Sequence, residues 1–202
     1  TRIVLASASP RRVELLRTMG IPHEVRRSGV DEAAIMADHP RTFAIRAAFA
    51  KAQDVAEKLE EETWVLAADT VVTRKMILFG KPESEVDARR MLHQLSGAAH
   101  DVITGLALSR SGSPDCYLQS VRTSVFFREL RDEEIEQYVA SGEPMDKAGA
   151  YGIQGIGGSL VDRIEGDYFN VVGLPCDTVA EMLEEAGLEF PVSLPVPPEK
   201  WR

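Results

Sequence analysis

Apolar residues along the chain fall into two patterns that alternate over most of its length. Short runs of aliphatic and β-branched residues, bounded by turn residues, predict β-strands. The predicted strands are 3–6, 22–28, 64–73, 101–109, 116–130, 160–164 and 168–172. A Ser-Gly-Ser-Pro turn joins the strands 101–109 and 116–130, which indicates a β-hairpin.

Longer segments repeat their apolar residues every three to four positions and therefore predict helices. The first has Ser9 as its N-cap, Pro10 at its first position and Gly20 after its end. The other predicted helices are 42–62, 84–95, 132–140 and 176–186. Helices between strands, together with a hairpin, predict an α/β fold with a mixed sheet.

Two segments fit neither pattern. Residues 147–158 are rich in glycine, and residues 191–198 are rich in proline. We expect one domain over residues 1–190, followed by a tail over 191–202 that is extended and poorly ordered.

The composition narrows the class of protein. Hydrophobic residues make up 44% of the chain and charged residues 27%, which is typical of a soluble globular protein. The formal net charge of −9 argues against binding to nucleic acid polymers or membrane surfaces, since both require a basic face. A small anionic ligand remains compatible with this charge, because a local cluster of Arg and Lys can form a positive pocket.

The cysteines and the apolar runs indicate a cytoplasmic location. Cys116 and Cys176 are far apart and lack metal-ligand spacing, so we expect two reduced thiols. No apolar run approaches the roughly 18 residues of a transmembrane helix. Residues 3–6 are too short for the apolar core of a signal peptide.

Two arginines stand in the first turn of the first predicted helix, where basic side chains are unfavourable. The helices that begin at Ser84 and Asp132 carry acidic residues there instead. Arg11 and Arg12 beside the free N–H groups of a helix start would form an anion site, and a guanidinium fork suits phosphate. The alternative is that both arginines point into solvent.

Asp69 is an unusual residue for its position, because it follows the buried apolar run 64–68. Aspartate is disfavoured in strands, and a buried carboxylate requires a partner. Such a group can hold Mg²⁺ or Mn²⁺ or orient an attacking water. The alternative is that Asp69 marks the end of the strand and caps a turn.

Three further polar residues stand in constrained surroundings. Lys51 lies among small apolar residues of its helix, and Lys81 lies in a Gly-Lys-Pro turn. Either could contact a triphosphate, although a lysine in such a place, taken singly, is more often a solvated surface residue. Gln154 lies in the glycine-rich segment, where its amide could pair with the edge of a base, or where the segment is simply a flexible loop.

Familiar catalytic motifs are absent from the sequence. The chain has no P-loop, no GxGxxG after a strand, no GxSxG and no HExxH. Its histidines show no metal-ligand spacing, so no histidine is an obvious general base.

Taken in order along residues 3–183, several motifs resemble the Maf family of nucleotide pyrophosphatases, also called septum formation inhibitor homologues. Any one of these motifs alone is weak, but their joint order is specific. The motifs are LASASPRR at 5–12, ADT at 68–70, GKP at 80–82, LSG at 95–97, TG at 104–105, the segment 146–155 and VVGLP at 171–175.

The resemblance implies a Maf/HAM1-like fold, in which an elongated mixed sheet is flanked by helices and a central cleft separates two lobes. It implies hydrolysis of a nucleoside triphosphate to the monophosphate and pyrophosphate with a divalent cation, Mg²⁺ or Mn²⁺. The GAYGIQ sequence at 149–154 resembles the dTTP/UTP subgroup. A homodimer is a further expectation from the family.

The resemblance also implies roles for individual residues. Asp69 matches the proton acceptor. Our own hypothesis, beyond the resemblance, is that Asp69 together with Glu32 holds the metal. The residues that match polar pocket positions are Ser9, Arg11, Arg12, Glu32, Lys51 and Lys81, and those tied to base choice are Arg11, Thr70 and Gln154.

Two other functions compete with this prediction. One is a non-catalytic nucleotide-binding regulator of cell division or septum formation, which would use the same pocket. The other keeps the chemistry but acts on a modified purine such as 7-methyl-GTP.

Overall fold

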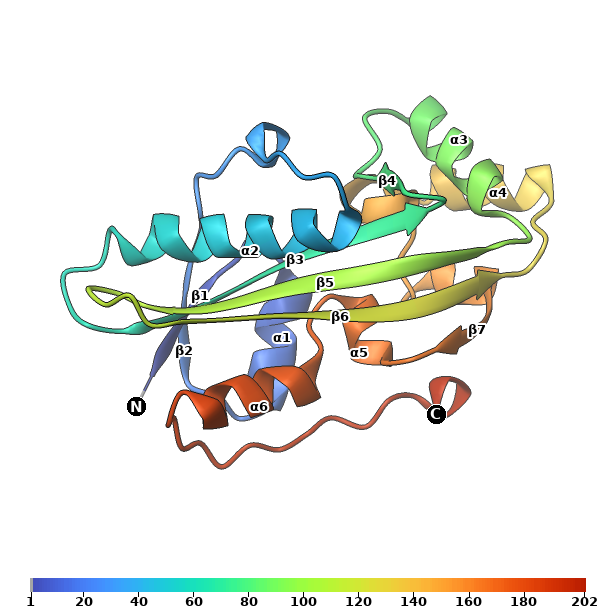
Figure 1. Ribbon diagram of the computed structural model, residues 1–202. Helices are drawn as coiled ribbons and strands as arrows, with labels where there is room; N and C mark the ends of the chain where they lie inside the picture. The colour runs from blue at the N-terminus through green and yellow to red at the C-terminus, as the bar shows by residue number, and fades with distance from the viewer. Residues whose placement is uncertain (1) are drawn as a thin grey trace.

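In residues 2–202, which the computed structural model describes, seven strands form one long mixed sheet (Figure 1). The strands are β1 (Ile3–Ala6), β2 (His23–Arg26), β3 (Trp64–Arg74), β4 (Ile77–Phe79), β5 (Ala99–Arg110), β6 (Cys116–Phe127) and β7 (Val161–Glu165). Their order is β2-β1-β3-β5-β6-β7, and β4 pairs with β3. The pairs β1–β2 and β1–β3 are parallel and the others antiparallel, which confirms the predicted mixed sheet.

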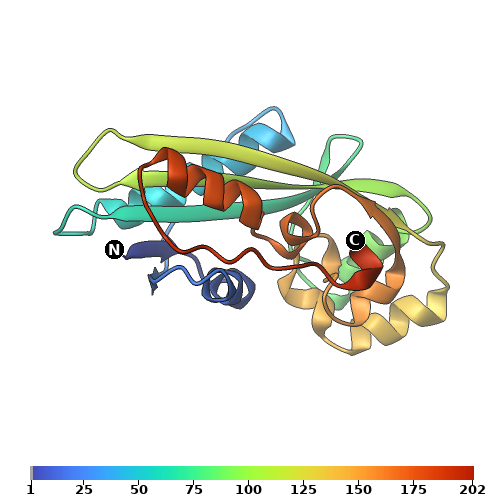
Figure 2. The ribbon, with the colours of Figure 1, turned by 90° about the horizontal axis from the view of Figure 1, so that it is seen from below.

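Helices cover both faces of the sheet (Figures 1 and 2). The helices are α1 (Pro10–Thr18), α2 (Pro40–Ala56), α3 (Glu85–Leu95), α4 (Asp132–Ala140), α5 (Tyr168–Val172) and α6 (Cys176–Glu185). Helix α2 lies along one face of β3 and β5, whereas α1, α5 and α6 lie on the opposite face. Helices α3 and α4 pack against each other at one end of the molecule.

Small residues bring α2 close to the sheet. Ala44, Ala47, Ala48 and Ala52 are fully buried on the helix face that meets the strands. Gly105 in β5 lies under this face, where a Cβ atom would come within 2.3 Å of the Ala44 carbonyl. This close approach holds α2, which carries Lys51, against β3 and β5.

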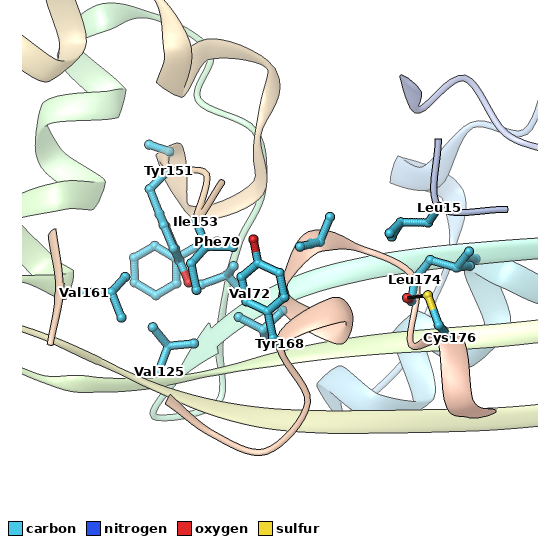
Figure 3. Close-up of a cluster of buried hydrophobic side chains, with 14 of the residues drawn as sticks. Leu15, Val72, Phe79, Val125, Tyr151, Ile153, Val161, Tyr168, Leu174 and Cys176 are labelled. Atoms are coloured by element: carbon cyan, nitrogen blue, oxygen red, sulfur yellow. Dashed lines mark hydrogen bonds between the residues drawn. The ribbon is translucent and has the colours of Figure 1, made fainter. Parts of the chain in front are cut away.

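The larger apolar core lies on the other face, under α1, α3, α4, α5 and α6. Figure 3 shows part of it, with Tyr151 and Ile153 pointing in among Val72, Phe79 and Val161. Two residues of the glycine-rich segment are therefore anchored in the core.

Helix α2 differs from its predicted bounds of 42–62. It begins at Pro40, with the His39 side chain accepting a hydrogen bond from the Arg41 N–H, and it ends at Ala56. The acidic residues at 60–62 would place negative charge at a helix C-terminus, which is unfavourable.

The prediction of a strand at 168–172 is wrong, because these residues form α5. The aromatic and β-branched sequence favours a strand, but Asp167 caps a helix by accepting a hydrogen bond from the Phe169 N–H at 2.8 Å. The buried Asn170 amide donates to the Val102 carbonyl and to Thr123 Oγ1. These tertiary contacts outweigh the local preference.

The tail after residue 190 is extended, as predicted, but it is not free of the domain (Figure 2). The Ser193 N–H donates to the Met19 carbonyl, and Lys200 Nζ donates to the Gly158 carbonyl. The Trp201 ring stacks on Tyr168, with 6.4 Å between ring centroids. The expectation of a poorly ordered tail is therefore wrong, since aromatic stacking and hydrogen bonds hold it against the surface.

Candidate active site

A cleft of about 680 Å³ opens at an interruption in the sheet. Strand β1 pairs with β3 only up to Ala67, and β4 pairs with the same edge of β3 only from Val72 onward. Between these points the edge of β3 has no strand neighbour within residues 2–202. Asp69 and Thr70 lie in this gap and border the cleft.

The cleft gathers all the residues predicted to form the site. They come from the β1–α1 loop, α1, the turn after β2, α2, β3, the turn after β4 and the glycine-rich segment. These residues are Ser9, Arg11, Arg12, Glu32, Lys51, Asp69, Thr70, Lys81 and Gln154.

Asp69 is the most buried carboxylate of the cleft, with 5% of its surface exposed. It lies opposite Gly105 in the β3–β5 pair, next to the region where α2 contacts the sheet. Lys51 of α2 donates to it, with 2.7 Å between Nζ and Oδ1. Lys51 Nζ also lies 2.6 Å from Oε1 of Glu32, which begins a short 3₁₀ turn at 32–34. One ammonium group therefore bridges two carboxylates.

The two carboxylates bind protons differently. Burial raises the pKa of Asp69, and the attraction of Lys51 only partly offsets it, while the nearby charge of Glu32 raises it further. Burial also raises the pKa of Glu32, but hydrogen bonding and attraction from Lys51, together with the charge of Lys81, bring its pKa below the usual value. Asp69 is thus the better proton acceptor of the pair.

Arg12 is held by the protein itself. Its Nε donates to the Gly173 carbonyl at 2.8 Å, and its Nη2 donates to Thr70 Oγ1 at 3.0 Å. The Thr70 hydroxyl lies 2.8 Å from Thr104 Oγ1, which in turn donates to the Asn170 carbonyl. Burial lowers the pKa of Arg12, but arginine stays charged in proteins. Arg12 thus places a fixed positive charge beside Thr70.

The start of α1 has the predicted cap. Ser9 Oγ accepts from the Arg12 N–H, and Pro10 is the first helical residue. The buried Ser7 hydroxyl accepts from the Ser9 N–H at 3.0 Å. Arg11 and Asp146 both line the cleft. The hydrogen bond from Lys147 is the main cause of the lowered pKa of Asp146, and the charge of Arg11 adds to it.

The sequence analysis did not single out several residues of the cleft. Ser7 and Gly173 line it and hold Ser9 and Arg12 in place. Lys147 also lines it and donates to Asp146 Oδ1 at 2.7 Å. The LASASP motif contains Ser7 and the VVGLP motif contains Gly173, so the motifs pointed to these positions without indicating a hydrogen-bonding role.

The donor set is compatible with a hard divalent cation. Within residues 2–202, no cluster of three or more His, Cys, Asp and Glu side chains is arranged to bind a metal. Lys51 contacts only one oxygen of each carboxylate, so Asp69 and Glu32 retain oxygen ligands of the kind that Mg²⁺ prefers. One or two carboxylates are enough where substrate phosphates and waters complete the shell.

Among residues 2–202, no helix is long and apolar enough to cross a membrane. The cleft is lined by the buried Asp69, by the carboxylates of Glu32 and Asp146, and by several cationic side chains.

Known proteins resemble this chain in sequence and in fold. The sequence profile of the Maf-like protein family matches residues 2–186. A dTTP/UTP pyrophosphatase of Geobacter sulfurreducens is 49% identical over 92% of this chain and 97% of its own length. Another protein of that name, from Alkaliphilus metalliredigens, is 44% identical over 91% of this chain and 95% of its own. Among solved structures, a HAM1 protein from Coxiella burnetii is 16% identical and covers 91% of this chain and 98% of its own, with a TM-score of 0.51. The last similarity confirms the predicted HAM1-like fold.

Proposed function

The chain belongs to the Maf family, and from that premise we propose that it is a nucleoside triphosphate pyrophosphatase acting on dTTP and UTP. The observation that carries the proposal is the pairing of Lys51 with the buried Asp69 inside the cleft lined by Arg11 and Lys81. A general base and a cationic surface for phosphates are the two requirements of this hydrolysis.

The proposed reaction breaks the bond between the α-phosphorus and the oxygen that bridges to the β-phosphorus. A water oxygen attacks the α-phosphorus, and Asp69 accepts the proton that this water loses. The raised pKa of Asp69 suits this role, because a base works best when its pKa approaches the working pH. Lys51 holds the carboxylate in place through its hydrogen bond to Oδ1.

The cations divide into two groups by their existing partners. Lys51 and Arg12 already contact protein groups. We therefore propose that they hold these groups in place and add positive charge to the cleft without contacting the phosphates directly. Arg11 and Lys81 are proposed to contact the β- and γ-phosphates, together with the hydroxyl of Ser9. Charge that develops on the leaving pyrophosphate is then neutralised in a site with fixed donors.

We propose that Asp69 and Glu32 are the protein ligands of a divalent cation, Mg²⁺ or Mn²⁺. When bound, such a cation supplies Lewis acidity toward the phosphate oxygens. Lys51 contacts one oxygen of each carboxylate, so a cation could take the other oxygen of each. The depressed pKa of Glu32 keeps this carboxylate ionised and ready to serve as a ligand.

We place the base beside the glycine-rich segment. Gln154 is exposed at the wall of the cleft and offers both a donor and an acceptor, which matches the edge of uracil or thymine. The residues proposed to bind the phosphates at the start of α1 and the residue proposed to meet the base line the same cleft.

A cytoplasmic location is also proposed. Cys116 and Cys176 are both unpaired, which suits a compartment that keeps thiols reduced.

The test is product analysis with the purified protein and UTP in the presence of Mg²⁺. The proposal predicts UMP and pyrophosphate in equal amounts, and faster turnover of dTTP and UTP than of 7-methyl-GTP or ITP. Formation of UDP and phosphate would refute it. Stabilisation by UTP without any turnover would instead support a nucleotide-binding regulator.

A further inference from the structure

The segment that carries Gln154 has little structure of its own to hold it. Residues 151–155 contain no helix or strand, although Tyr151 and Ile153 are anchored in the core. Backbone hydrogen bonds along the segment are sparse, and one of the few runs from the Gly158 N–H to the Gly155 carbonyl. Its shape around Gln154 must therefore come from other parts of the protein.

Glu143 supplies much of that support. Its Oε1 accepts from the Gly157 N–H and its Oε2 accepts from the Ile156 N–H, both at 3.0 Å. Tyr138 of α4 donates its hydroxyl to Glu143 Oε1 at 2.8 Å and accepts from the Gly152 N–H at 3.0 Å. The two side chains thus bind backbone N–H groups on both sides of Gln154.

The segment packs so tightly against Glu143 and Tyr138 that only glycine fits at two of its positions. A Cβ atom on Gly155 would lie 2.4 Å from Glu143 Oε2. A Cβ atom on Gly157 would lie 2.5 Å from the Tyr138 hydroxyl and 2.3 Å from the Gly152 carbonyl. The glycines thus let the backbone wrap around the carboxylate, which is a more specific role than flexibility.

The carboxylate is ionised when it makes these contacts. Burial raises the pKa of Glu143, but hydrogen bonds from Gly157, Tyr138 and Ile156 outweigh that effect and lower it overall. Hydrogen bonds to a charged acceptor are stronger than those between neutral groups. Neither Glu143 nor Tyr138 lines the cleft, so neither is placed to touch a substrate.

From these contacts we propose that Glu143 is a positioning residue for base selection. With Tyr138, it fixes the backbone of residues 152–157 and so sets the direction in which Gln154 meets a pyrimidine. This inference rests on the proposed function, since it assigns the base to the wall that Gln154 forms.

The test compares Glu143→Gln with Glu133→Gln, a matched change at an exposed position of α4. Glutamine keeps the size of the side chain but replaces one accepting oxygen with an N–H₂ group, which cannot accept from a backbone N–H. We measure exchange of the backbone amide hydrogens in the protein without nucleotide. In Glu143→Gln, exchange at residues 152–157 should become roughly tenfold faster, because one backbone N–H loses its hydrogen bond to a charged acceptor. Exchange elsewhere should match the control.

Kinetics give the second readout. Glu143→Gln should raise KM for UTP roughly tenfold while kcat changes less than about twofold, and it should reduce the preference for UTP over ATP. Tyr138→Phe should show the same effects in weaker form, because Glu143 is still present. An equal loss with both nucleotides, or unchanged exchange at 152–157, would overturn the proposal.

The two readouts separate this inference from the proposed function. If the wild-type protein hydrolyses no nucleotide, the proposed function fails, and hydrogen exchange alone decides whether Glu143 fixes the segment. If exchange quickens but the preference for UTP is unchanged, the role in base selection is refuted while the hydrolysis stands.

Discussion

At the scale of single residues, the site keeps a carboxylate where the fold would be more stable without its charge. Asp69 is buried, and its pKa is raised mainly by that burial despite the contact with Lys51. A raised pKa means that the ionised form is less favourable in the folded protein than in the unfolded chain. Ionised Asp69 therefore lowers stability above the unfolded pKa of about 3.9, and this cost disappears as the pH falls.

Asp69→Asn tests this balance. At pH 7.5 the variant should unfold at the same or a higher temperature than wild type, because it carries no buried charge at this position. Its turnover of UTP should fall by about 100-fold or more, since a neutral amide cannot accept the proton. The unfolding temperature and the rate of UMP formation are measured for wild type, for Asp69→Asn and for Asp162→Asn, a control change at an exposed position. Near-normal turnover would remove Asp69 from the mechanism.

A second prediction concerns His100 and the dependence of stability on pH. Burial lowers the pKa of His100 to about 3, and the charge of Arg74 adds to this effect. The unfolded chain therefore binds a proton at this residue below about pH 6.5, whereas the folded protein does not until about pH 3. Stability falls with decreasing pH across this window, by up to about 1.4 kcal/mol for each pH unit.

His100→Gln removes this proton uptake. The free energy of unfolding in urea, measured from pH 6.5 to pH 4, should fall less steeply for this variant than for wild type. The matched control is His93→Gln, which changes a histidine with an exposed side chain. Equal slopes for wild type and His100→Gln would show that His100 titrates normally in the folded protein.

At the scale of elements, α1 brings two neighbouring arginines to the cleft for different purposes. Arg12 ties the helix to Thr70 in β3 and to the Gly173 turn, whereas Arg11 faces the cleft near Asp146. Arg12→Ala should lower the free energy of unfolding by about 1–3 kcal/mol, because it leaves buried partners without a donor. Arg11→Ala should leave stability unchanged and raise KM for UTP.

Urea unfolding and steady-state kinetics of both variants decide this point. Equal effects of the two substitutions on stability would contradict the division of roles, as would an unchanged KM for Arg11→Ala.

Elements with strong local signals were predictable from the sequence. The cap of α1 by Ser9 and Pro10, the bounds of α4 and the hairpin of β5 and β6 all agree with the structure. Strand β4 was missed because its turn places Lys75 and Met76 at positive φ, without the Asn or Gly that usually marks such a turn. Helix α5 was taken for a strand because the contacts that decide it come from Asp167 and distant strands.

At the scale of the whole molecule, the residues of the cleft could be predicted from the sequence, but the contacts between them could not. Asp69 and Lys51 were separate candidates, one from its place in a strand and the other from its place in a helix. The fold joins them at 2.7 Å between Nζ and Oδ1 through the approach of α2 to the sheet. The interruption between β1 and β4 arises from long-range strand pairing, which no local pattern encodes. The same holds for Arg12, whose partners Thr70 and Gly173 are far away in sequence.

A prediction about overall stability concerns the tail after residue 190. A chain that ends at residue 193 loses the stacking of Trp201 on Tyr168 and the Lys200 hydrogen bonds. We expect its unfolding temperature to fall by roughly 2–8 °C, which corresponds to 1–2 kcal/mol for a chain of this size. Turnover of UTP should persist at 25 °C, because the cleft contains no residue beyond Gly173. Trp201→Ala should give part of the loss, and an unchanged unfolding temperature would show that the docked tail adds nothing.

The most direct test of the central claim is hydrolysis of UTP in water enriched in ¹⁸O, followed by mass spectrometry of the products. Attack on the α-phosphorus with Asp69 as the base predicts one ¹⁸O atom in UMP and none in pyrophosphate, with the label appearing about 100-fold more slowly for Asp69→Asn. Label in pyrophosphate, or in free phosphate beside UDP, would contradict the account.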